Sequence, residues 1–124
     1  MEDPLTDALR DELLLARRAG DRDLTSVLRT ALASLANAEA VPEVTDDGAL
    51  TSAHVAGARH GLGAADVPRR ALTAAERRNV VAAEVASLEE AAGVYDELDP
   101  ARAAEARRGA AVLAAVLARA GTAH

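Results

Sequence analysis

Apolar residues recur at helical spacing along the first part of the chain. Four of them lie at successive intervals of four, four and three positions: Leu5, Leu9, Leu13 and Ala16. This spacing places them on one face of a helix. Asp3-Pro4 suits the start of that helix, because aspartate caps free amides and proline lacks only an N–H that would be unpaired. With Gly20 as the left-handed residue that ends it, the pattern predicts a helix over about residues 4–19.

A second helical stripe follows a tight reversal at Gly20-Asp21. Either Asp21 or Asp23 can cap it. Its apolar members are Leu24, Leu28, Ala31, Leu32, Leu35 and Ala38. The pattern predicts a helix over about residues 22–39, and so short a connection makes the two helices an antiparallel αα-hairpin.

Residues 40–72 carry no strong period, and glycine and proline punctuate them. Thr51 or Ser52 can cap a short helix over about residues 52–60, ended by Gly61. The remainder of this segment is predicted to be loop.

The second half of the chain predicts two longer helices. Thr73 and Glu76 form a capping-box pattern, in which each side chain satisfies a free amide at the helix start. A heptad-like apolar stripe follows, made of Val81, Val85, Leu88, Ala92 and Tyr95. These features predict a helix over about residues 74–97, and Asp99-Pro100 begins a last helix over about residues 100–119, with Gly121 beyond it. We therefore expect one all-α domain over residues 1–124, an antiparallel αα-hairpin followed by a second long-helix pair in a small bundle.

Composition supports helices and indicates a thin core. Alanine, the best helix former, supplies 33 of the 124 residues, and Tyr95 is the single aromatic residue. Alanine buries little area, so the helix axes must lie close together. Leu14 and Leu15 beside Leu13 give the first helix apolar surface on more than one side, which favours a protein partner or self-association.

Charge and cysteine content narrow the classes of function. The net charge is −6 and all fourteen basic residues are arginine, so the chain lacks the broad positive field of nonspecific nucleic-acid binders. Without cysteine there is no disulfide or thiolate metal site. The acidic start, Glu2 and Asp3, does not suit a signal peptide. The longest apolar run, Gly109 to Ala118, falls short of the roughly 20 residues that span a bilayer. We expect a soluble cytoplasmic protein without membrane contact.

No pattern in the sequence suits catalysis, a cofactor or a metal ion. His54 and His60 are six residues apart rather than the four of helical metal sites, and Glu-x-x-His is absent. Gly57, Gly61 and Gly63 follow no predicted strand and precede no Lys-Ser or Lys-Thr, so we interpret them as turn residues. The sequence thus predicts no catalytic, cofactor-binding or metal-binding residue, which argues against an enzyme without deciding the question.

Arginine gives the one candidate surface. Most arginines are expected to be solvated or paired with nearby carboxylates, which stabilises little. Arg17, Arg18 and Arg22 gather at the hairpin turn, where a local anion site is the alternative interpretation.

The hairpin contains a group of residues that is typical of one family of small helical proteins: Ala16-Arg17, the turn Gly20–Asp23, Leu28-Arg29 and Asn37-Ala-Glu39. In these residues the hairpin resembles the GatB/YqeY family. A looser likeness continues through Leu72-Thr-Ala-Ala-Glu76, Tyr95 and Glu105. The similarity covers about residues 5–40 well and about residues 72–118 loosely.

The resemblance implies a helical domain linked to tRNA-dependent amide formation. Relatives of the YqeY type usually carry a further small C-terminal domain, which is similar to the tRNA-binding tail of the amidotransferase B subunit; the sequence to His124 does not contain it. Two functions follow: a noncatalytic binding or adaptor domain, or a tRNA-linked accessory protein related to the glutamine-dependent amidotransferase. The candidate partner or tRNA surface comprises Arg17, Arg18, Arg22, Arg29, Asn37 and Glu39.

Overall fold

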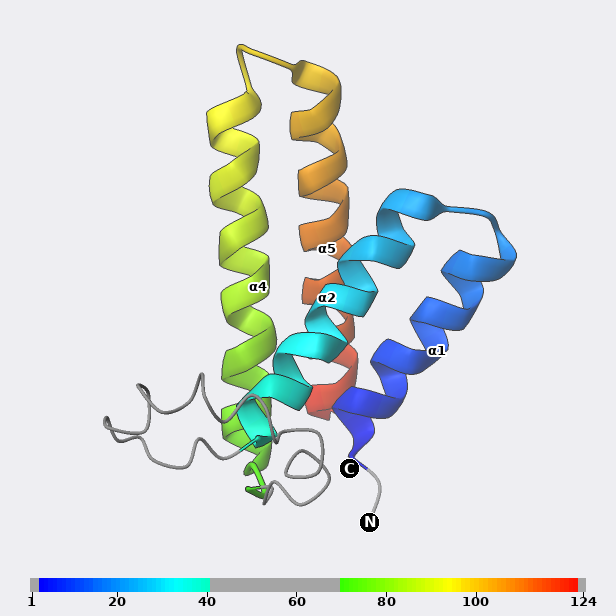
Figure 1. Ribbon diagram of the computed structural model, residues 1–124, viewed down its shortest axis with the longest axis vertical. Coiled ribbons are helices and arrows are strands. Elements are labelled where there is room, and N and C mark those ends of the chain that lie inside the picture. The colour runs from blue at the N-terminus through cyan, green and yellow to red at the C-terminus, as the bar shows by residue number, and fades with distance from the viewer. Residues whose placement is uncertain (1–2, 41–69, 123–124) are drawn as a thin grey trace, which may run out of the picture.

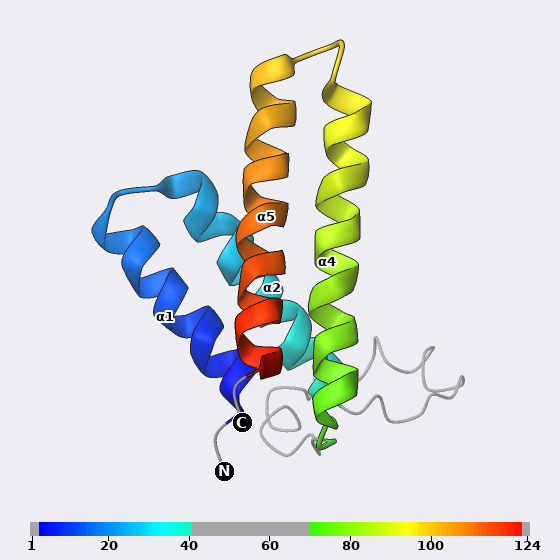
Figure 2. The same ribbon diagram turned by 180° about the vertical axis from the view of Figure 1, so that it is seen from behind.

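Two antiparallel helical hairpins form the protein. The computed structural model describes residues 3–40 and 70–122, which contain four helices: α1 (Pro4–Arg18), α2 (Arg22–Glu39), α4 (Ala74–Tyr95) and α5 (Pro100–Thr122). The α1–α2 hairpin packs against the lower part of the α4–α5 hairpin, whose turn projects beyond it (Figures 1 and 2). This confirms the predicted all-α bundle. None of the helices in the described part of the chain is long and apolar enough to cross a membrane.

The helices begin where capping chemistry predicts. The Thr6 and Leu24 amides donate to the carboxylates of Asp3 and Asp21, at 2.9 and 3.1 Å. Asp21, rather than Asp23, therefore caps α2. Gly20, in the turn before it, has a φ of 70°, the left-handed conformation that glycine tolerates.

Both hydrogen bonds of the predicted Thr73–Glu76 capping box form at the start of α4. The Glu76 amide donates to the Thr73 hydroxyl at 3.0 Å, and the Thr73 amide donates to the Glu76 carboxylate at 2.9 Å. Local hydrogen-bonding residues thus set the start of this helix as well.

One predicted helix end is wrong because of a tertiary contact. Helix α5 does not end at residue 119 but continues through Gly121 to Thr122. Arg78 of α4 donates from Nη1 to the Leu117 carbonyl at 2.9 Å, and a Cβ on residue 121 would lie 2.9 Å from the same Nη1. The guanidinium thus occupies space that glycine leaves open beside the last turn. The predicted short helix at residues 52–60 lies outside the described residues.

All four helices contribute to a single apolar core. Its buried members are Leu5, Leu9, Ala16, Leu28, Ala31, Leu35, Leu72, Val81, Leu113 and Val116. In the alanine-rich first half of α5, Ala103 and Ala110 are buried, so this half packs closely. The apolar stripes predicted for α1, α2 and α4 therefore face inward.

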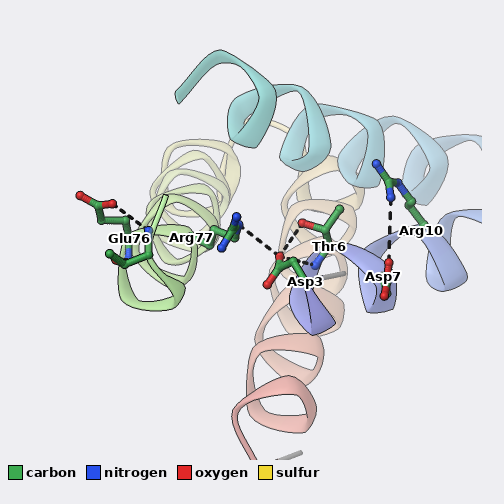
Figure 3. A network of polar contacts seen from close by, with 7 residues as sticks. Asp3, Thr6, Asp7, Arg10, Glu76 and Arg77 are labelled. Carbon is green, nitrogen blue, oxygen red and sulfur yellow. Dashed lines mark hydrogen bonds and ion pairs between the residues drawn. The ribbon is translucent and has the colours of Figure 1, made fainter. Parts of the chain in front are cut away.

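A helix cap also joins the two hairpins. The Asp3 carboxylate accepts from the amide and the hydroxyl of Thr6, at 2.9 and 2.6 Å, and lies 3.4 Å from Nε of Arg77 in α4 (Figure 3). Nearby, the Arg70 amide donates to the Glu39 carbonyl at 2.6 Å. The chain therefore returns from the segment 41–69 beside the end of α2.

Candidate functional site: an arginine depression at the hairpin turn

Eight of the twelve arginines in the described part of the chain have a protein partner. Seven form ion pairs, and Arg78 donates to a carbonyl. The other four form neither kind of contact with any described residue: Arg17, Arg18, Arg22 and Arg29. All four are exposed and belong to the α1–α2 hairpin. Among the described residues, the arginines without such a partner therefore lie in one hairpin.

Three of these arginines line one open depression of about 660 Å³. The lining residues are Arg17, Gly20, Arg22, Thr25, Ser26, Arg29, Thr30 and Ala33. On α2 they recur at three- and four-residue steps, which is the spacing of one helix face. Arg17 is contributed by the last turn of α1, beyond which the chain reverses at Gly20. We call this surface the arginine depression.

The arginine depression has the chemistry of an anion-binding surface. Each guanidinium is a planar fork that can bind two oxygens of a phosphate or carboxylate. The hydroxyls of Thr25, Ser26 and Thr30 add neutral donors. The lining contains no acid, base or thiol that could act as nucleophile or proton carrier. No set of His, Cys, Asp or Glu within residues 3–40 and 70–122 has the geometry to hold a metal ion.

The structure brings together three of the six residues proposed from the sequence. Arg17, Arg22 and Arg29 share the depression, whereas Arg18 is exposed outside its lining. Asn37 is exposed more than one turn beyond the depression along α2. Glu39 is half-buried and borders a separate small pocket of about 150 Å³. The three hydroxyl residues were not predicted from the sequence, although Thr25 and Ser26 lie three or four residues from both Arg22 and Arg29.

A neighbouring ion pair neutralises the acidic residue of the turn. Arg108 of α5 donates from Nη1 and Nη2 to the Asp21 carboxylate at 2.9 and 3.0 Å, and from Nη2 to Glu105 at 2.9 Å. These bonds, followed by the Leu24 amide, lower the pKa of Asp21 below its ordinary value. The contact joins α5 to the hairpin turn and pairs Asp21 with Arg108.

This ion pair predicts a pH-dependent effect of Arg108→Gln. Since the pKa of Asp21 is lowered in the folded state, the stabilisation is present above the ordinary pKa near 4 and lost as pH falls through the lower folded value. The variant should have a lower melting temperature than the wild type at about pH 7, and the difference should narrow as the pH falls below about 4. Thermal unfolding followed by circular dichroism measures this. The matched variant Arg18→Gln should show no such gap, and a gap independent of pH would contradict the assignment.

Several residues considered in the sequence analysis lie outside the described part of the chain: His54, Gly57, His60, Gly61, Gly63 and His124. The chain matches no family model, no curated protein and no solved structure.

Proposed function

We propose that the chain is a noncatalytic binding module of the GatB/YqeY type, whose arginine depression holds an anionic group of a partner. The observation that carries the proposal is the convergence of Arg17, Arg22 and Arg29, none of them paired with a described residue, on one concave surface. Unpaired guanidinium groups bind carboxylates or phosphates without first breaking an internal ion pair. The resemblance of the hairpin to GatB/YqeY proteins supports the same type of module.

A second candidate is a tRNA-linked accessory protein. It is favoured by the pairing of arginine with three hydroxyl residues in the depression, because both kinds of side chain are common partners of nucleic-acid phosphates. The net charge of −6 opposes a wide electrostatic footprint. Binding through this surface would therefore rest on about three phosphate contacts.

Titration with tRNA tests this candidate. Three phosphate contacts predict that the logarithm of the affinity falls with the logarithm of salt concentration with a slope of about −2 to −3. Arg29→Glu should weaken binding by about tenfold or more, since it reverses a charge in the depression. In the matched variant Arg70→Glu, the substituted arginine pairs with Glu76 and lies beside the C-terminal end of α2, opposite the hairpin turn. This variant should keep most of the affinity for tRNA. Absence of binding at low salt would reject the tRNA role.

A further inference from the structure

The exposed large apolar side chains among the described residues form two pairs. Leu14 and Leu15 are 47% and 57% exposed in α1, just before the hairpin turn. Val94 and Leu98 are 63% and 76% exposed at the α4–α5 turn. Each pair therefore lies beside a hairpin turn, on a different hairpin.

The α4–α5 turn is strongly acidic. Residues 89–99 contain five acidic side chains and no basic one: Glu89, Glu90, Asp96, Glu97 and Asp99. Asp96 and Asp99 lie within ion-pair distance of Arg107 and Arg102, at 2.8 and 4.0 Å. The three glutamates, all exposed, have no ion pair with any residue the structure describes. We call Glu89, Glu90, Val94, Glu97 and Leu98 the acidic tip.

The acidic tip and the arginine depression carry opposite charges. The tip stands on the end of α4 and α5 that projects beyond the α1–α2 hairpin, whereas the depression is concave (Figures 1 and 2). The tip contributes three glutamates and the depression three arginines, and none of the six forms an ion pair with a described residue. Leu14 lies one turn before Arg17 and Arg18, so apolar surface flanks the depression as it does the tip. The two turns are well separated in a single chain (Figure 1).

We propose that the acidic tip of one copy docks in the arginine depression of a second copy of this chain. This rests on the proposed function, since the depression must bind an anionic group, and it names that group as the tip carboxylates. Two different surfaces meet, so the contact is heterologous, and it produces a closed ring or an open chain of copies. Exposed ion pairs and a small apolar contact make such an association weak and sensitive to salt.

The overall charge favours the tip over a nucleic acid as the occupant. Two copies of a chain of net charge −6 also repel each other at long range, but this repulsion is smaller than that between the chain and a long polyanion such as tRNA. Carboxylates also bind guanidinium forks in bidentate geometry, as Asp96 does with Arg107 at 2.8 Å for both bonds.

Sedimentation velocity of the full chain, over a range of concentrations at low and high salt, tests the proposal. The depression variant Arg17→Glu/Arg29→Glu and the tip variant Glu90→Arg/Glu97→Arg should each weaken self-association by about tenfold or more. An equal mixture of the two should associate again, because one chain keeps an intact tip and the other an intact depression. The matched variants Arg70→Glu and Asp11→Arg, outside both surfaces, should stay within about twofold of the wild type.

Three results would overturn the proposal: a wild-type monomer at about millimolar concentration in low salt, variants that associate as the wild type does, or a mixture that fails to associate. A monomer that still binds tRNA or inorganic tripolyphosphate through Arg29 would reject self-docking and leave the proposed anion-binding function intact. Circular dichroism verifies that each variant is folded. If a double variant is unfolded, the milder substitutions Arg29→Gln and Glu97→Gln replace it, and each is expected to weaken self-association.

Discussion

Replacing Leu28 with alanine is expected to lower the free energy of unfolding by about 3 kcal/mol. Leu28 is fully buried in α2, the helix that packs against α1, α4 and α5. Alanine removes buried apolar surface and leaves a cavity that neighbouring small side chains cannot fill. Because domains of this size are stable by only about 5–15 kcal/mol, this single change removes a large share of the total.

Chemical denaturation followed by circular dichroism measures the loss at Leu28. The matched variant Leu98→Ala makes the same change at a side chain that is 76% exposed, and should alter stability by less than about 0.5 kcal/mol. Equal effects of the two substitutions would contradict the core described above.

Replacing Gly109 with leucine is expected to destabilise the protein by about 2 kcal/mol. A Cβ at this buried position would already lie 3.0 Å from Cγ2 of Val27 in α2 and 3.5 Å from Cδ1 of Leu88 in α4. The remaining leucine atoms have no room unless the helices separate. Leucine is the better helix former by somewhat under 1 kcal/mol, and overpacking outweighs this gain.

Gly93 in α4 provides the matched control. A Cβ at Gly93 would meet nothing within 4 Å, so Gly93→Leu keeps only the gain in helix propensity. We expect it to stabilise the fold by roughly 0.5 kcal/mol, opposite in sign to Gly109→Leu. Thermal unfolding, measured at low protein concentration, compares the stability of the two variants. Two shifts in the same direction would show that helix propensity, rather than close packing, governs these positions.

The close approach at Gly109 shows where prediction from sequence stops. The spacing of apolar residues in α1, α2 and α4 predicts which face turns inward, because a helix face depends on neighbours three and four residues apart. Alanine and arginine alternate through the first half of α5 without such a stripe. Only its position against Val27 and Leu88 decides that this half is tightly packed.

The arginine depression, too, could be predicted only in part from the sequence. Arg17, Arg18 and Arg22 were expected together because the hairpin turn links them within a few residues. The Asp21 carboxylate in the same turn pairs instead with Arg108, which is 87 residues away in the sequence. No spacing rule predicts a pairing over that distance.

Local chemistry in the sequence thus determined the four described helices, their starts and the two hairpins. Capping and turn residues act within one helical turn, so the linear sequence contains the relevant neighbours. Tertiary structure alone decided the extension of α5 through Gly121, the burial of Gly109 and the choice of which arginines stay unpaired. Each of these depends on an atom from a different helix, which the chain brings close only when the two hairpins pack together.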